Sequence, residues 1–217
     1  MGKDQTALIR EILEDRSEVS VNDTCSTSTE AVVVVTCSMC MRNPNSLTPT
    51  LDQPRKQISI KTLANQVWVK CNGDTVLNRE LERLTDEYNV GAVLVVGHTD
   101  CDVVSRSCDR CFGRNTEVPP GIEVYLDPLV SLVKRAFEEG IVDSSTHMNK
   151  TKHRIVEYNV GRQVEFLEQK LPVSTTVSGY IFDQDGVYGS RVDEHYKVTG
   201  TETEITGVQD ILTQDKP

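Results

Sequence analysis

Two uninterrupted runs of aliphatic residues dominate the hydrophobic pattern of the chain. The first reads AVVVVTC over Ala31–Cys37, and the second reads VGAVLVVGH over Val90–His98. Apolar runs of this kind, without alternating polar residues, are typical of strands buried on both faces of a parallel sheet. Shorter runs predict two further strands, QVWV over Gln66–Val69 and VSGYIF over Val177–Phe182.

Segments with apolar residues at helical spacing lie between these strands. We expect helices over Thr75–Tyr88, Leu126–Glu139 and Ile155–Lys170, and a helical turn within Gln57–Ala64. Strands that alternate with helices need crossover connections, which produce a parallel sheet. The predicted fold is therefore α/β, with a mostly parallel sheet of about four or five strands and flanking helices on both sides.

The pattern divides the chain into three regions. Residues 1–30 contain an amphipathic helix over Thr6–Ser17 followed by a polar linker, residues 31–190 form the α/β domain, and residues 191–217 form a tail without a clear period. Because only one face of the Thr6–Ser17 helix is apolar, we expect it to pack against another surface, such as a partner subunit.

Composition narrows the class of protein. The chain has 33 acidic and 23 basic residues and a net charge of −10, which argues against nucleic-acid binding because phosphate backbones recruit Lys and Arg. No signal peptide and no apolar run long enough to span a bilayer is visible, so we expect a soluble, cytoplasmic protein. Its seven cysteines, an odd number in a reducing compartment, favour metal binding or redox chemistry over disulfides.

Both long hydrophobic runs end in a side chain that binds metal ions. Cys37 ends the first run, His98 ends the second, and Cys101 follows three residues after His98. Ligand sites of open parallel sheets lie beyond the carboxyl ends of the strands, so neighbouring strands would bring these side chains together. Each residue alone is better explained as part of the core. Together, two thiolates and one imidazole predict a zinc site.

The same segments resemble the β-class carbonic anhydrases. Cys37 at a strand end, VWVKCNGDTV over residues 67–76 and GHTDC over Gly97–Cys101 occur in the order found in that family, and VSGYIFDQDG over residues 177–186 resembles its closing strand. The resemblance implies a zinc ion held by Cys37, His98 and Cys101, with water, hydroxide or an aspartate in the fourth position.

The resemblance also implies an activity and an assembly. Zinc-bound hydroxide would add to carbon dioxide and release bicarbonate, which makes the protein a zinc lyase with a small-molecule substrate and no nucleic-acid or membrane partner. A homodimer or a higher homo-oligomer is expected, with the amino-terminal helix embracing the neighbouring subunit.

The segment after the first ligand departs from the family pattern. The family places an aspartate and an arginine shortly after that cysteine, whereas this chain reads CSMCMR over Cys37–Arg42, without a carboxylate. Arg42 is the candidate for the arginine's role as electrostatic orienter. Asp74, Asp100 and Asp102 are candidates for the missing carboxylate, although a capping or surface role explains each of them better.

Cys40 supports a different function. With Cys37, His98 and Cys101 it completes a set of three cysteines and one histidine, which is the composition of a closed structural zinc site without an open position for water. The protein would then be a non-catalytic zinc-binding module. A further alternative is a zinc hydrolase of a sulfur analogue, such as carbonyl sulfide or carbon disulfide, because Met39 and Met41 would make the pocket more apolar.

The remaining cysteines and histidines receive no catalytic role. Cys108 and Cys111 form a second C-x-x-C pair, which we interpret as incidental cysteines in a surface loop, with a redox pair or a metal clip as the alternative. His153 lies between Lys152 and Arg154, which favours a solvated side chain over a proton shuttle.

Overall fold

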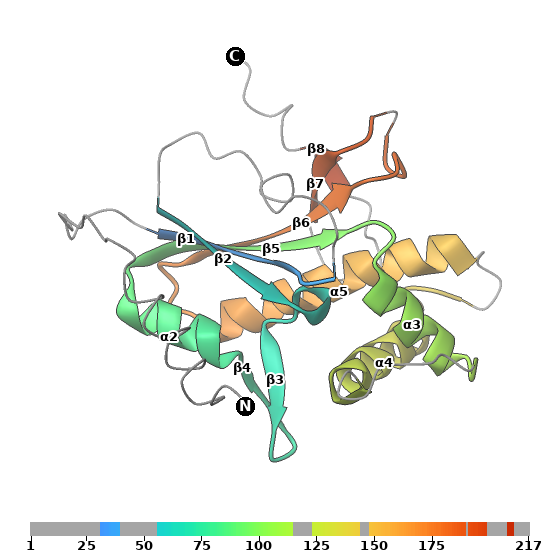
Figure 1. The fold of residues 1–217 in the computed structure, drawn as a ribbon, viewed down its shortest axis with the longest axis horizontal. Coiled ribbons are helices and arrows are strands. Elements are labelled where there is room, and N and C mark those ends of the chain that lie inside the picture. Colours follow the sequence, from blue (N-terminus) through green and yellow to red (C-terminus); the bar gives the residue numbers. More distant parts are fainter. Residues whose placement is uncertain are drawn as a thin grey trace, which may run out of the picture.

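A six-stranded sheet forms the centre of the molecule (Figure 1). The computed structural model describes residues 31–39, 56–114, 123–143, 148–189 and 191–198, and the backbone of 208–210. In spatial order the strands are β2 (Lys56–Thr62), β1 (Ala31–Cys37), β5 (Val90–His98), β6 (Thr176–Asp183), β7 (Glu194–Val198) and β8 (Val208–Asp210).

The first four strands of this order are parallel, and the last two are antiparallel. β1 pairs with β2 on one side and with β5 on the other, and β5 pairs with β6. β7 and β8 continue the sheet beyond β6. All residues of β1 are buried, and so are most of those of β5, as expected for central strands covered on both faces.

Four helices of the described chain lie beside the sheet (Figure 1): α2 (Arg79–Glu87), α3 (Asp102–Cys111), α4 (Glu123–Glu138) and α5 (Met148–Lys170). Helix α5 crosses β5 and β6 and contacts α4 and α3 at one end of the sheet. None of the helices described is both long and apolar enough to cross a membrane.

Two glycines let α5 approach the sheet closely. A Cβ atom on Gly97 would lie 2.7 Å from Val160 Cγ2, and one on Gly179 would lie 2.6 Å from Val160 Cγ1. Both distances are too short for a real contact, so the valine fits only because β5 and β6 have no side chain at these positions. The strand that carries His98 is thus packed tightly against α5.

An antiparallel hairpin projects from the domain (Figure 1). It consists of β3 (Trp68–Cys71) and β4 (Asp74–Leu77). Asn72 and Gly73 form its turn with φ values of 51° and 91°, which suits the two-residue turns that the Asn-Gly pair favours. Asn78 then caps α2, because its side chain accepts a hydrogen bond of 2.9 Å from the backbone N–H of Glu80.

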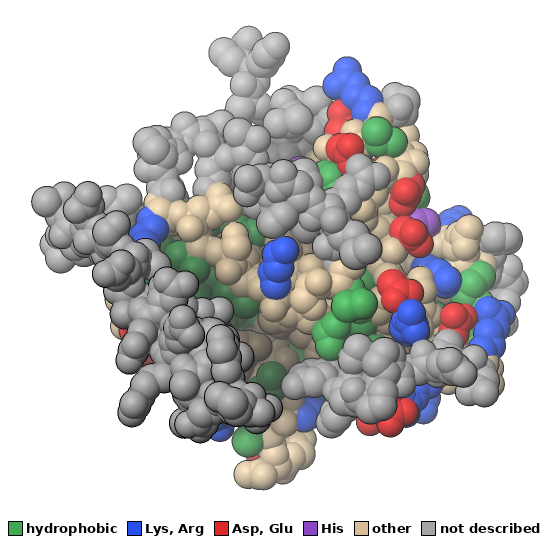
Figure 2. Space-filling view, in the orientation of Figure 1, with side chains coloured by type: hydrophobic (Ala, Val, Ile, Leu, Met, Phe, Trp, Pro, Cys, Tyr) green, Lys and Arg blue, Asp and Glu red, His purple; other side chains and the backbone are tan. Residues whose placement is uncertain are grey.

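Acidic and basic side chains are mixed on the described surface. Figure 2 shows them side by side over the region of α3 and α4. They include ion pairs of Arg106 with Asp102 at 2.7 Å and of Arg110 with Asp127 at 3.5 Å. The excess of negative charge in the sequence is therefore locally balanced on this face.

The α/β class and the mostly parallel sheet are confirmed, and β1 and β5 have the bounds that the sequence predicts. The helical turn expected in Gln57–Ala64 is wrong, because this segment is mainly strand β2, followed by a short 3-10 helix, η1 (Leu63–Asn65). The helix expected over Thr75–Tyr88 is wrong in its first part, where β4 completes the hairpin. The Thr6–Ser17 helix lies outside the described residues.

Candidate metal centre

The ends of β1 and β5 bring the predicted ligands together. The two strands are parallel neighbours with Thr36 opposite Val96, so both end at the same edge of the sheet. Cys37 closes β1 and His98 closes β5. The chain then turns through Asp100, whose φ is 53°, and reaches Cys101 at the N-cap of α3.

The three ligand atoms form one compact, buried cluster. All of them lie within 4.8 Å of one another, and Cys37 Sγ is 4.0 Å from Cys101 Sγ. Exposed fractions are only 1% for Cys37, 4% for His98 and 4% for Cys101. Two thiolates on one tetrahedral zinc ion, each at about 2.3 Å, would lie about 3.8 Å apart. The spacing of the sulfur atoms therefore fits zinc.

The imidazole of His98 is oriented for metal binding. Its Nδ1 lies 2.8 Å from the carbonyl oxygen of Thr99, whereas its Nε2 is buried and has no hydrogen-bond partner within the described part of the chain. A histidine that donates from Nδ1 to a carbonyl keeps a lone pair on Nε2, which is the tautomer of a metal ligand. A metal ion would satisfy this buried atom.

The hydrogen bond between Cys37 and Cys101 shifts the pKa values of the two thiols in opposite directions. The hydrogen bond from Cys101 lowers the pKa of Cys37 well below its ordinary value, and His98 lowers that pKa further. The same hydrogen bond, together with burial, raises the pKa of Cys101. These shifts favour Cys37 as the first of the two thiols to ionise, and both must be deprotonated to hold a metal ion.

Gln184 fixes the turn that follows β5. Its backbone N–H donates to Thr99 Oγ1 at 2.8 Å, and its Nε2 lies 2.9 Å from the Thr99 carbonyl oxygen and 2.8 Å from His98 Nδ1. Because Gln184 follows β6, these contacts connect two neighbouring strand ends. Sequence reasoning missed this residue, although it lies in the DQDG segment that resembles the family.

Asp183 holds the loop that carries Gln184. Its side chain is fully buried and accepts hydrogen bonds from the backbone N–H groups of Asp185, Val187 and Tyr188 at 3.2, 3.0 and 2.9 Å. A carboxylate with several backbone donors is a strong acceptor. Asp183 therefore anchors the loop beside the metal centre.

The remaining predicted site residues are either exposed or outside the described part of the chain. Cys40 and Arg42 fall outside the described residues. Asp74 and Asp100 are exposed, and Asp102 is exposed in the first turn of α3, where it pairs with Arg106. The buried cluster in the described chain thus consists of two cysteines and one histidine, without a carboxylate.

Two expectations about other residues are wrong. Cys108 and Cys111 lie in α3 rather than in a surface loop, and Cys108 is fully buried, which raises the pKa of its thiol to about 12. Such a thiol packs as a small hydrophobic side chain. His153 is half-buried rather than solvated, and burial lowers its pKa.

Comparison with known proteins identifies the family of the chain. The sequence profile of the family described as carbonic anhydrase matches residues 32–180. No curated protein matches the chain.

Solved structures share the fold at low sequence identity. The β-carbonic anhydrase CcaA has a TM-score of 0.59 at 14% identity and covers 90% of this chain and 95% of its own. CafA of the fungus Aspergillus fumigatus has 0.54 at 16%, covering 82% of each chain. A tetrameric β-carbonic anhydrase of the ascomycete Sordaria macrospora has 0.53 at 17%, covering 82% of this chain and 91% of its own. The profile spans more than half of the sequence, and the chain therefore belongs to the β-class carbonic anhydrase family.

Proposed function

We propose that this protein is a zinc-dependent carbonic anhydrase that interconverts carbon dioxide and bicarbonate. The observation that carries the proposal is the buried cluster of Cys37, His98 and Cys101 in a chain of this family. When bound there, zinc supplies the Lewis acidity that allows a water molecule to ionise at about pH 7.

The three protein ligands leave room for that chemistry. Two thiolates balance the charge of a divalent ion, and a neutral imidazole completes three positions of a tetrahedral site. Cys37 and His98 lie at the ends of two rigid strands, and Cys101 begins α3. The Thr99 carbonyl oxygen, to which Gln184 Nε2 also donates, holds the imidazole in one orientation. A fourth, open position is what distinguishes a catalytic zinc site from a structural one.

Arg42 is the residue that we propose as electrostatic orienter. It follows the first ligand closely in the sequence, and a guanidinium group near the metal would attract the oxygen atoms of bicarbonate. No aspartate accompanies it in CSMCMR, so in this chain the positive charge has to act without the carboxylate partner that the family places there.

The proposal includes a reducing, cytoplasmic location and a homo-oligomer. With sulfur atoms 4.0 Å apart, Cys37 and Cys101 would be prone to oxidise together wherever zinc is scarce, so a reducing compartment protects the site. A homodimer or a larger assembly is supported by the family, since the Sordaria macrospora relative is tetrameric.

Stopped-flow hydration of carbon dioxide on protein of verified zinc content tests the function. We expect a rate that rises with pH through an ionisation at about 7 to 8 and disappears in Cys101→Ser. Cys71→Ser is the matched control, because Cys71 is exposed and does not belong to the cluster.

Sulfur counting by X-ray absorption at the zinc edge separates the alternatives. Two sulfur ligands leave the site open, whereas three would assign Cys40 to the metal and make the protein a non-catalytic zinc module. Full zinc occupancy with three sulfur ligands and no hydration at any pH would overturn the proposal. Two sulfur ligands, together with turnover of carbonyl sulfide but not of carbon dioxide, would make carbonyl sulfide the substrate in place of carbon dioxide.

A further inference from the structure

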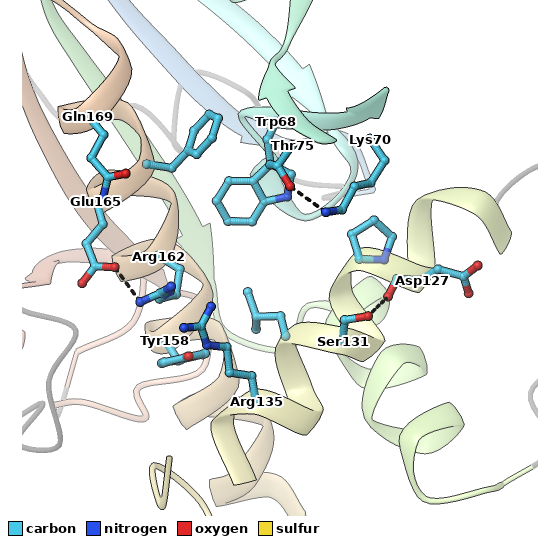
Figure 3. A pocket seen from close by; sticks show the side chains of 13 residues that line it. Trp68, Lys70, Thr75, Asp127, Ser131, Arg135, Tyr158, Arg162, Glu165 and Gln169 are labelled. Atoms are coloured by element: carbon cyan, nitrogen blue, oxygen red, sulfur yellow. Dashed lines mark hydrogen bonds and ion pairs between the residues drawn. The ribbon is translucent and has the colours of Figure 1, made fainter. Parts of the chain in front are cut away.

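A cavity of about 580 Å³ lies between the hairpin β3–β4 and helices α4 and α5 (Figure 3). It faces the side of α5 that carries Tyr158, Arg162 and Phe166, opposite the side that carries Val160 against Gly97. None of the three metal-binding residues lines it. We propose that this cavity is a second binding site, for a small organic anion with a flat apolar body.

The apolar walls of the cavity suit a flat ring. Trp68 and Phe166 meet edge to face with their ring centroids 5.3 Å apart, and Pro128 and Leu132 of α4 line the cavity as well. Aromatic rings in this arrangement present both a face and an edge to a bound ring. The volume falls within the range of about 300 to 1,000 Å³ that small-molecule sites occupy.

Three cationic side chains determine the charge of the ligand. Lys70, Arg135 and Arg162 line the cavity from the hairpin, α4 and α5. Figure 3 shows Arg135 and Arg162 extending to the same side, next to Tyr158. The ammonium group of Lys70 donates to a neutral group, Thr75 Oγ1, at 2.6 Å. Cations that converge on a partly apolar cavity favour an anion, because the low polarity strengthens their attraction.

The acidic partners of these side chains leave donors for a ligand. Arg135 pairs through Nε with Glu139, which does not line the cavity, at 2.6 Å. The Asp127 carboxylate points away from the cavity in Figure 3 and lies 3.5 Å from Arg110. Glu165 approaches a single nitrogen of Arg162, Nη1, at 2.8 Å. A guanidinium group has five N–H donors, so Arg162 keeps donors for a ligand. Carboxylates and phosphates are the anions whose geometry a guanidinium group matches best.

The chain offers a direct reporter for this site. Trp68 is its only tryptophan, so intrinsic indole emission comes from the cavity wall alone. Para-nitrobenzoate is a flat anion whose nitroaromatic ring quenches indole on contact, and para-nitrobenzyl alcohol is a neutral compound of nearly the same shape. We expect saturable quenching by the anion, and binding at least about tenfold weaker for the alcohol and for Arg162→Gln.

Two control variants make the test specific. Arg83→Gln removes an arginine that forms the same kind of helix ion pair, with Glu80 on α2, but does not line the cavity, and it should bind the anion normally. Cys101→Ser should also bind normally, because the proposed site does not use the metal. Loss of binding in Cys101→Ser alone would assign the anion to the metal centre and overturn the proposal.

Other results would also overturn it. Equal quenching by the anion and the alcohol, or normal binding in Arg162→Gln, would show that the cationic side chains do not select an anion. The emission of Trp68 could instead respond to neither compound but change when the protein is diluted until its oligomer dissociates. This result would assign the cavity to a second copy of the chain. Emission insensitive to the compounds and to dilution would leave no small-molecule site.

Discussion

The Nε2 atom of Gln184 lies 2.8 Å from the Nδ1 atom of His98, and this contact connects the ends of β6 and β5. Nδ1 is the ring nitrogen turned away from the candidate metal position, since Nε2 is the one without a partner among the described residues. In the metal-binding tautomer of His98, its Nδ1 atom and Gln184 Nε2 both carry N–H donors, and both donate to the Thr99 carbonyl oxygen, at 2.8 Å from Nδ1 and 2.9 Å from Gln184 Nε2. An acceptor held in this way fixes the ring orientation of a metal-binding histidine. Gln184 is therefore a positioning residue for the metal centre.

Loss of the Gln184 side chain should weaken zinc binding. We expect Gln184→Ala to lower zinc affinity about 10-fold to 100-fold, because the Thr99 carbonyl oxygen that accepts from His98 Nδ1–H loses the hydrogen bond that holds it in place. Gln184→Glu should retain more affinity, since a carboxylate accepts a hydrogen bond from Nδ1–H. Competition with a chromophoric chelator measures both values. Gln57→Ala, an exposed glutamine of β2, is the control, and equal affinities throughout would contradict the assignment.

A side chain at Gly97 should conflict with helix α5. Gly97→Ala places a Cβ atom 2.7 Å from Val160 Cγ2, and such overpacking costs about 1 to 3 kcal/mol. Val160→Ala should relieve the conflict, so the double variant should be more stable than the sum of the single changes predicts. Urea unfolding of the four proteins measures the coupling. Additive effects would show that α5 moves freely away from β5.

Burial of Glu157 should make stability depend on pH. This side chain is 5% exposed, and desolvation raises the pKa of its carboxyl group above 4.5. Below a pH of about 4.5 the Glu157 carboxyl group is protonated in both the folded and the unfolded chain, so its contribution to stability is fully present. Above it the unfolded chain ionises first, and stability falls as the pH rises through the raised pKa of the folded state.

Glu157→Gln removes this titration. The variant should therefore gain stability relative to the original protein as the pH rises above about 4.5. Thermal unfolding at a series of pH values measures the difference. A variant that instead loses stability at higher pH would show that the ion pair of Glu157 with Arg154, at 3.7 Å, outweighs the cost of burial.

Neutralising Asp183 should loosen the loop beside the metal centre. We expect Asp183→Asn to cost about 1 to 3 kcal/mol, because an amide replaces a carboxylate that accepts three backbone hydrogen bonds. Chemical denaturation measures this loss. The exposed neighbour Asp185 provides the control, since Asp185→Asn should change stability little. An equal effect of both substitutions would mean that the loss reflects net charge alone.

The sequence predicted the parts of the fold that local pattern determines. The valine run ending at Cys37 and the aliphatic run ending at His98 were sufficient to predict two buried parallel strands, and parallel neighbours must bring their carboxyl ends together. The three-residue spacing from His98 to Cys101 then completed the cluster. This prediction succeeded because each step depended on neighbouring residues or on a general property of sheets.

Two local signals in the sequence indicate strands where the helical spacing predicts helix. Ile58 and Ile60 alternate with polar residues in KQISIKT, which is the period of a half-buried strand, yet the segment was interpreted as a helical turn. Asn72-Gly73 is a strong hairpin signal, whereas Val76 and Leu77 fit the helical spacing of the following residues, which favours a helix over the same segment.

Contacts between distant segments could not be found by pattern. Gln184 reaches His98 across 86 positions of the chain, and nothing in its neighbours indicates that partner. The cavity beside Trp68 needs a hairpin and two helices in their final arrangement. The C-x-x-C spacing of Cys108 and Cys111 does not indicate the burial of Cys108, which depends on how α3 packs against α4 and α5.

The central position of β1 has a consequence for the kinetics of metal loss. Every residue of this strand is buried, and residues 31–36 are paired with strands on both sides, while Cys37 is paired with β2. The amide hydrogens of the strand should therefore exchange with solvent only when the whole domain opens. Cys37 is therefore attached to one of the slowest-opening segments of the molecule. Cys101, by contrast, follows a short turn and begins a helix at the end of the sheet. A zinc ion leaving the folded protein should detach from Cys101 first, so mutations that loosen α3 should accelerate zinc release before they change global stability.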